Sequence, residues 1–146
     1  MKISASFKKN YPDLSVWITT NIPKTINKPK VWKAFLKYSE LIPDDAKKAL
    51  KKGSNPILDY KVMPRSNGMF SASKFPNKIF LAKSICDKFE KYKKEAGNKK
   101  MHILLESTIL HEMTHWGDWR DKKHQKIEEG KAFEKAAYGK DVNRYW

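Results

Sequence analysis

The residues whose types and spacing suggest chemistry are His111, Glu112 and His115, which form an H-E-x-x-H pattern. The residues just before the pattern, 101–110, are typical of a helix. Residues four positions apart lie on one face of an α-helix, so the two imidazoles can point at the same metal ion. The alternative is that two helical histidines lie four residues apart by chance.

The predicted chemistry uses each of these residue types. Two neutral imidazoles bind Zn²⁺ without cancelling its charge, and the ion then lowers the pKa of a water in an open coordination position. Glu112 is placed to accept that proton as a general base and to deliver it to a leaving amine. A structural zinc site would close its fourth position with Cys or His, and the sequence offers neither for that role. The pattern therefore favours a catalytic zinc site over a structural one.

Length and composition predict one domain over residues 1–146. A chain of this size buries about two-thirds of its unfolded surface, so it is expected to fold without disulfides. The single cysteine, Cys86, cannot form an internal bridge and is expected in the core. There is no apolar run of about 18 residues, and residues 1–10 lack the hydrophobic region of a signal peptide. We therefore expect no membrane span, and any export must be directed from outside this sequence.

The net charge of +15 is carried mainly by lysines, many of them in adjacent pairs. Such a surface attracts nucleic acid, anionic membranes or acidic proteins, and it keeps a domain in solution. No nucleic-acid motif accompanies the charge, so we expect solvated lysines rather than a specific nucleic-acid site.

Periodicity and turn residues predict an α+β architecture with helices and a small sheet before the H-E-x-x-H helix. Helices are expected at residues 31–39, 43–52, 84–95 and 125–138, and strands at residues 57–63, 69–73 and 79–82. Residues 14–20 are compatible with a strand or a short helix. Gly117 is expected to end the H-E-x-x-H helix, with a turn over residues 118–123. The sheet is expected to be mostly antiparallel and to pack on this helix and on the glutamate-bearing helix that follows.

This order of a sheet, an H-E-x-x-H helix, a short turn and a second helix with glutamates resembles the zincin metallopeptidases. More narrowly, residues 110–118, followed by 128–134 and 137–139, are similar to the metallopeptidase toxin domains at the C-terminal ends of bacterial polymorphic toxins and secreted effectors. Asn67 and Gly68, together with residues 77–90, give a weaker match upstream. The resemblance implies a gluzincin-type zinc peptidase that is delivered into a target cell, with a protein substrate and a cognate immunity protein.

The resemblance also implies a third protein ligand on the second helix, and two glutamates compete for this role. Glu129 precedes Gly130, and in several gluzincins a small residue after the ligand glutamate lets two helices approach. Glu134 follows His115 after an 18-residue gap, a spacing that also occurs in a zincin group, and lies nearer the apolar side of its helix. At about 100° per residue the two side chains point about 140° apart, so both cannot bind the ion from one regular helix. Glu129 is slightly favoured as the third ligand. Glu134 is the alternative, either as the third ligand itself or as a hydrogen-bond partner of a ligand side chain.

Three other acidic residues lie near the pattern in sequence. Asp121 stands six residues after His115, at the third-ligand position of the metzincin pattern, but that pattern requires glycine where this chain has Asp118. Asp118 is better interpreted as an outer carboxylate that accepts an N–H from a ligand imidazole. Glu128 is as compatible with a solvated surface position as with a role in the site.

Substrate binding and oxyanion stabilisation have open alternatives. A tetrahedral intermediate needs a donor besides the metal, and Arg120, His124, Tyr138 and Tyr145 have suitable side chains, but spacing selects none of them. The strand at residues 79–82 is either the edge to which a peptide substrate adds or an ordinary buried strand.

The sequence therefore predicts a zinc-dependent endopeptidase that acts as the toxic domain of a secreted effector. Zn²⁺ would be bound by His111, His115 and one glutamate, with Glu112 as general base. Two alternatives remain open. One is a non-toxic regulatory or housekeeping zinc peptidase, and the other is a basic nucleic-acid-binding module whose metal site is structural or vestigial.

Overall fold

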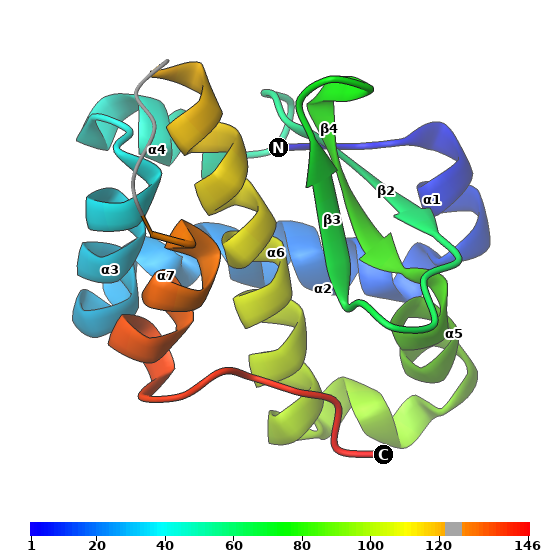
Figure 1. The fold of residues 1–146 in the computed structure, drawn as a ribbon. Coiled ribbons are helices and arrows are strands. Elements are labelled where there is room, and N and C mark those ends of the chain that lie inside the picture. Colours follow the sequence, from blue (N-terminus) through cyan, green and yellow to red (C-terminus); the bar gives the residue numbers. More distant parts are fainter. Residues whose placement is uncertain (122–126) are drawn as a thin grey trace.

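The structure, a computed structural model, describes residues 1–121 and 127–146. The first half consists of β1 (Lys2–Ile3), α1 (Ala5–Asn10), α2 (Pro12–Asn21), the 3-10 helix η1 (Ile22–Asn27), α3 (Pro29–Ser39) and α4 (Pro43–Leu50). The second half consists of β2 (Ile57–Lys61), β3 (Gly68–Ser71), β4 (Phe75–Ala82), α5 (Lys83–Lys91), the 3-10 helix η2 (Lys93–Gly97), α6 (Lys99–Arg120) and α7 (Glu129–Tyr138). Figure 1 shows α6 in the centre, with the sheet on one side and α3 and α7 on the other. The sheet thus packs on α6 as expected, but the expectation that it also packs on the following glutamate-bearing helix is wrong, because α7 packs on α3 and on the other side of α6. The α+β class predicted from the sequence is confirmed.

The sheet is mixed, which corrects the expectation of a mostly antiparallel one. Its strand order is β1-β2-β4-β3. The β1–β2 and β2–β4 pairs are parallel, and only the β3–β4 pair is antiparallel. Parallel strands need a long crossover, and the helices from α1 to α4 supply it between β1 and β2. The two-residue strand β1 is not among the strands predicted from the sequence, so this crossover was not predicted either.

The segment at residues 14–20 lies in helix α2. Its start has the signals of a helix, because Pro12 occupies the first turn beside the acidic Asp13. Leu14, Ile18 and Ile22 then recur every four residues and are fully buried. The β-branched composition that is compatible with a strand is therefore overridden by a helical pattern of buried side chains.

The H-E-x-x-H helix continues past Gly117 and ends at Arg120, so the expected stop at Gly117 is wrong. Gly117 serves close packing instead. A Cβ atom there would lie 2.8 Å from the backbone oxygen of Ser39 and 3.0 Å from Cγ of Leu41. The absent side chain thus lets α6 pass close to the end of α3.

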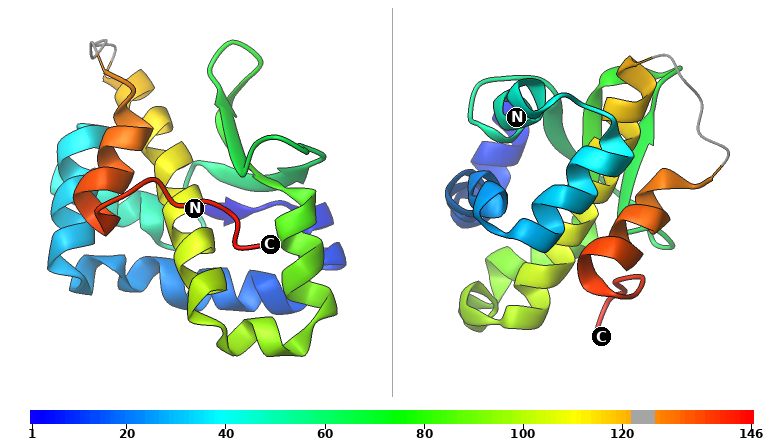
Figure 2. Two further views of the ribbon diagram at one scale, coloured as in Figure 1. Left: turned by 60° about the horizontal axis from the view of Figure 1, so that its bottom comes forward. Right: turned by 90° about the vertical axis from the view of Figure 1, so that its left-hand side faces the viewer.

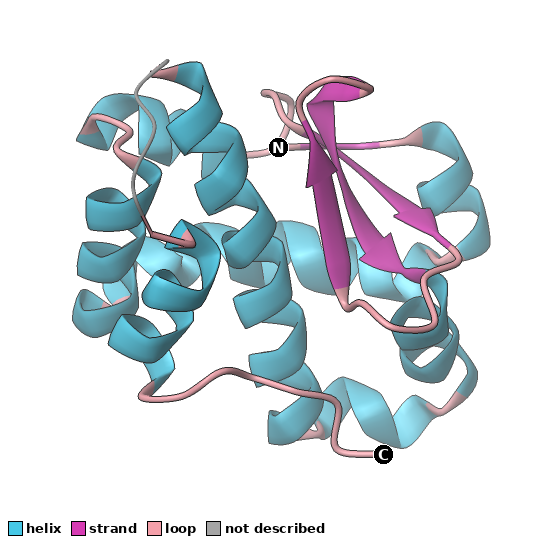
Figure 3. Cartoon of the chain, in the orientation of Figure 1, coloured by secondary structure: helices cyan, strands magenta, loops and turns pink. Residues whose placement is uncertain are grey.

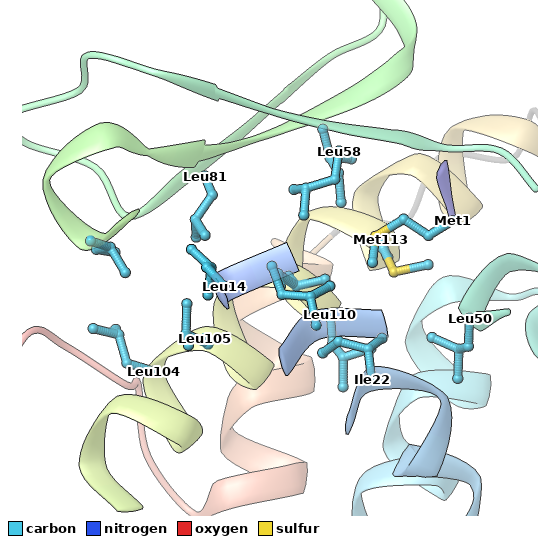
Figure 4. Close-up of a cluster of buried hydrophobic side chains, with 14 of the residues drawn as sticks. Met1, Leu14, Ile22, Leu50, Leu58, Leu81, Leu104, Leu105, Leu110 and Met113 are labelled. Atoms are coloured by element: carbon cyan, nitrogen blue, oxygen red, sulfur yellow. The ribbon is translucent and has the colours of Figure 1, made fainter. Parts of the chain in front are cut away.

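The core lies between the sheet and the central helix. Figure 4 shows buried side chains of the sheet and helices meeting there, among them Leu58, Leu81, Leu14, Leu104, Leu105, Leu110 and Met113. Cys86 on α5 is also fully buried in this cluster, as expected. The core therefore fixes α6 against the sheet along the turns that carry the two histidines.

Helices α3, α6 and α7 lie side by side, as Figure 2 (right) shows. Helix α7 begins at Glu129, whereas the predicted start at Gln125 lies outside the described residues, as does the end of the turn predicted at 118–123. Figure 3 shows the chain leaving α7 as an irregular segment that crosses α6. No helix in the described parts of the chain is long and apolar enough to cross a membrane.

Candidate metal site and cleft

The two histidines of the H-E-x-x-H pattern point their Nε2 atoms at one place. His111 and His115 lie one turn apart on α6, and their Nε2 atoms are 3.1 Å apart. Two nitrogens that bind one tetrahedral zinc at about 2.0–2.1 Å would lie about 3.3 Å apart. The observed separation is close to this value, so the pair fits one metal ion.

The carboxylate at this place belongs to Glu128. Its Oε1 atom lies 2.7 Å from Nε2 of His115 and 3.8 Å from Nε2 of His111. Glu128 is the residue immediately before α7, and it accepts hydrogen bonds from the backbone N–H groups of Gly130 and Lys131. These bonds hold the carboxylate at the start of the helix. The three candidate ligand atoms lie within 4.8 Å of one another.

The two glutamates favoured by sequence contact the other side of the imidazoles. Oε1 of Glu129 lies 2.5 Å from Nδ1 of His115, and Oε1 of Glu134 lies 2.7 Å from Nδ1 of His111. A carboxylate on Nδ1 fixes the ring and its tautomer and leaves Nε2 free for a metal. The geometry therefore differs from the expectation that one of these glutamates is the third ligand.

Gly130 lets the start of α7 approach the site, as the sequence suggested for a small residue there. A Cβ atom at Gly130 would lie 2.3 Å from Nε2 and 2.4 Å from Cδ2 of His111. Any side chain at this position would occupy the space of the imidazole ring.

Glu112 lies beside the histidines and is 7% exposed. Burial raises the pKa of Glu112 to about 7, while positive charge on His111 and His115 acts in the opposite direction. The backbone of Gly68 covers its side chain, because a Cβ atom at Gly68 would lie 2.8 Å from Cγ of Glu112. A buried carboxyl group with this pKa can accept and return a proton near neutral pH.

The pKa of His111 is raised by its carboxylate neighbours. Burial alone would lower it, but the hydrogen bond with Glu134 and the nearby charges of Glu112 and Glu128 outweigh that effect. The surroundings of the two rings are therefore strongly negative, which favours a cation at this place.

A cleft of about 320 Å³ opens beside His111 and Glu112. Its walls come from α6, from α7, from the loop before β3 and from the segment after α7. The lining residues are Ser66, Asn67, Gly68, Thr108, His111, Glu112, Lys131, Glu134, Asp141, Val142 and Asn143.

The edge of the sheet at this cleft is β3, which begins at Gly68. Residues 79–82 belong to β4, which lies between β2 and β3. Of the two alternatives for that strand, the buried strand is therefore correct. An added peptide strand would have to pair with β3.

The remaining sequence candidates lie elsewhere. Asp118 and Asp121 lie with Glu40 in an acidic group that is separate from the group of His111, His115 and Glu128. This position differs from the one expected for Asp121 as a metal ligand and for Asp118 as the partner of a ligand imidazole. The hydroxyl group of Tyr138 donates to Glu106, that of Tyr145 donates to Glu95, and Arg120 stacks on Trp116. His124 lies outside the described residues. The structure thus singles out none of these four as an oxyanion donor.

An H-E-x-x-H helix whose histidines meet carboxylates of a second helix is the arrangement of a metallopeptidase. A family model described as metallopeptidase toxin 3 matches residues 7–139. The chain belongs to this metallopeptidase toxin family, which implies a metal ion in the site. No curated protein and no solved structure matches the chain.

Proposed function

We propose that this domain is a zinc-dependent endopeptidase and the toxic part of a secreted bacterial effector. The observation that carries the proposal is the meeting of Nε2 of His111, Nε2 of His115 and Oε1 of Glu128 beside a buried carboxyl group. Two imidazoles and one carboxylate with an open fourth position are the donor set of a catalytic zinc site. In this proposal Glu128 is the third ligand, in place of Glu129 or Glu134.

Zinc, when bound, would supply Lewis acidity to a water and to the peptide carbonyl. Glu112 accepts a proton from the attacking water and delivers it to the leaving amine. Glu129 and Glu134 hold the Nδ1 atoms of the two imidazoles, so that both Nε2 lone pairs face the carboxylate of Glu128. The peptide substrate lies along the free edge of β3, with its scissile bond beside Glu112.

The first experiment is the metal content of protein purified without chelator, measured by mass spectrometry. We expect about one zinc per chain in the native protein and in Glu112→Gln, and none in His115→Ala. Quenched-fluorescence peptides should be cleaved by the native protein and not by Glu112→Gln. A native protein that takes up no zinc after reconstitution, or a Glu112→Gln variant with native activity, would overturn the proposal.

Expression inside bacterial cells tests the toxic role. The native domain should reduce viability and Glu112→Gln should not, whereas a housekeeping peptidase would be tolerated. A nucleic-acid-binding module would instead keep its activity in Glu112→Gln and would lose DNA or RNA affinity steeply with salt.

A cognate immunity protein is part of the proposal. The net charge of +15 favours an acidic partner, and charge complementarity makes association faster at low salt. Binding should therefore weaken as ionic strength rises, and an affinity that does not change with salt would contradict this part.

A further inference from the structure

The chain crosses the site once more after α7. Residues 141–146, here called the strap, have no regular secondary structure. Figure 1 shows the strap in red, running from the end of α7 across α6, and Figure 2 (left) shows the same crossing. Asp141, Val142 and Asn143 of the strap line the cleft. The family match ends at residue 139, so the strap lies beyond it.

The start of the strap is tied to His111 through one carboxylate. The backbone N–H of Val142 donates to Oε2 of Glu134 at 2.7 Å, and this bond is buried. The other oxygen of Glu134 lies 2.7 Å from Nδ1 of His111. Because each oxygen of Glu134 has its own partner, the strap helps to fix the carboxylate that orients the imidazole.

The middle of the strap is tied to the loop before β3 through Arg144. Its Nε donates to Oδ1 of Asn67 at 2.9 Å, and its Nη2 donates to the backbone oxygens of Ser66 at 2.8 Å and Met63 at 3.2 Å. The planar guanidinium presents several donors in a fixed arrangement, so a single side chain can hold this loop at three points. Lysine, with one ammonium group, cannot reproduce that arrangement.

The loop held by Arg144 leads directly to the cover of Glu112. The backbone oxygen of Asn67 accepts from the N–H of Ala82 at 2.8 Å, which fixes the loop on β4. Gly68 follows and rests on the side chain of Glu112, where a Cβ atom would lie 2.8 Å from Cγ and 2.9 Å from Oε1. A displacement of this loop would uncover the carboxyl group.

The far end of the strap is anchored away from the cleft. The hydroxyl group of Tyr145 donates to the buried carboxylate of Glu95. The ammonium group of Lys88 lies 4.9 Å from the ring centre of Trp146, which is within the range of a cation–π contact. These contacts keep Arg144 in place between two fixed ends.

We propose that the strap is a built part of the catalytic site and that Arg144 is a positioning residue for Glu112, acting through Asn67 and Gly68. The proposal rests on the proposed peptidase function. It adds a role for a segment that the family match does not cover and that the H-E-x-x-H pattern does not predict. Through Val142 and Arg144, the same six-residue segment supports both the imidazole of His111 and the general base.

The test compares Arg144→Ala and Arg144→Lys with Arg65→Ala. Arg65 is exposed on the same loop and makes no hydrogen bond or ion pair among the described residues, which makes it a matched control. We expect kcat of Arg144→Ala to fall about 10- to 100-fold, because a displacement of about 1 Å at a reacting group has an effect of this size. KM and zinc content should change little. Arg144→Lys should restore only part of kcat, and Arg65→Ala should behave as the native protein.

A second measurement does not depend on the metal or on activity. Amide hydrogen exchange in the zinc-free protein should become faster at residues 66–71 and at Ala82 in Arg144→Ala, and not in Arg65→Ala. Adding Asn67→Ala to Arg144→Ala should lower kcat little further, because the two residues act in one chain of contacts.

A native kcat in Arg144→Ala, or a loss that only follows lost zinc or a lower melting temperature, would overturn the proposal. Failure of the peptidase function itself would be recognised separately, since the native protein would then bind no zinc or cleave no peptide.

Discussion

A Cβ atom on Gly130 would lie 2.3 Å from Nε2 of His111, the imidazole nitrogen that faces Glu128. The first turn of α7 therefore touches the ring with its backbone. This contact brings Glu128 to the two histidines, because Glu128 immediately precedes the helix. The site thus depends on a close approach of two helices that only glycine permits.

Gly130→Ala should weaken zinc binding. The added methyl group must displace the imidazole or the start of α7, and overpacking of this kind costs about 1–3 kcal/mol. The substitution should not harm α7 itself, since alanine favours helix over glycine by about 1 kcal/mol. Zinc affinity can be measured by competition with a chromophoric chelator, with circular dichroism as the check on folding.

Gly97→Ala is the control for this prediction. A Cβ atom at Gly97 has no heavy atom within 4 Å, so zinc affinity should be unchanged. A Gly130→Ala protein with native zinc affinity would show that α7 does not approach the imidazole as described.

The three glutamates around the histidines should differ in their effect on zinc. Glu128→Gln removes the only carboxylate on the Nε2 side among the described residues, and zinc should no longer bind at one per chain at micromolar concentrations. Glu129→Gln and Glu134→Gln remove partners of Nδ1 and should lower the affinity about 10- to 100-fold, with full loading at high zinc. Titration followed by mass spectrometry distinguishes the two outcomes. Loss of stoichiometric zinc in Glu129→Gln or Glu134→Gln, with Glu128→Gln native, would restore the ligand expected from sequence.

The placing of His111, Glu112 and His115 side by side on one helix was predictable because the H-E-x-x-H pattern is local. Their relative positions follow from four-residue spacing on one helix, and buried residues on both sides keep that helix regular. Glu128 was not predictable in the same way. Its backbone is extended, with φ −78° and ψ 98°, so the helical angle used to compare Glu129 with Glu134 does not apply to it. A helix predicted to begin at Glu129 would have placed Glu128 at its N-cap. The helix was instead predicted from Gln125, which placed Glu128 inside it.

In the fold, too, the features that depend on neighbouring residues were predicted, and those that depend on residues far apart in sequence were not. Helix α3 and the strands near Ile57 and Ile79 were recognised because side-chain periodicity is a property of a few neighbouring residues. The parallel pairing of β1 with β2 joins residues more than 50 positions apart, and a strand of two residues is too short to show a pattern that predicts it. The role of Gly117 was missed for the same reason, since its partner Ser39 is distant in sequence.

Tyr138 should contribute to stability and not to catalysis. Its hydroxyl group donates to Oε1 of Glu106 at 2.8 Å, while Lys28 contacts Oε2 at 2.5 Å. Tyr138→Phe leaves the buried carboxylate with one of these two partners, which should lower the free energy of unfolding by about 1–3 kcal/mol. Urea unfolding of the zinc-free protein measures the loss, and kcat should stay native.

Tyr92→Phe is the matched control, since Tyr92 is 45% exposed and its hydroxyl group makes no hydrogen bond to the described residues. It should leave both quantities unchanged. A large fall in kcat for Tyr138→Phe at native stability would return Tyr138 to the list of oxyanion donors.

The lining of the cleft predicts which peptides are cleaved. Around Glu112 the cleft presents hydroxyl and amide groups from Ser66, Asn67, Thr108 and Asn143. Among the described residues that line the cleft, Val142 is the only large aliphatic one. Burying a large apolar side chain against such groups gains little, because they would lose water without new partners. Peptides with small or polar residues next to the scissile bond should therefore be cleaved faster than those with aromatic residues.

Two exposed charges of opposite sign refine this preference. Lys131 lies in the first turn of α7 and Asp141 lies beyond its end, so they mark different ends of the cleft wall. Neither side chain has an ion-pair partner among the described residues, which leaves both available to a substrate. Asp141→Asn should lower kcat/KM for lysine-containing peptides up to about fivefold relative to glutamate-containing ones, since exposed ion pairs contribute at most about 1 kcal/mol. Lys131→Gln should shift the ratio in the opposite direction, and equal losses for both peptides in Asp141→Asn would mean that Asp141 supports the strap and does not select the substrate.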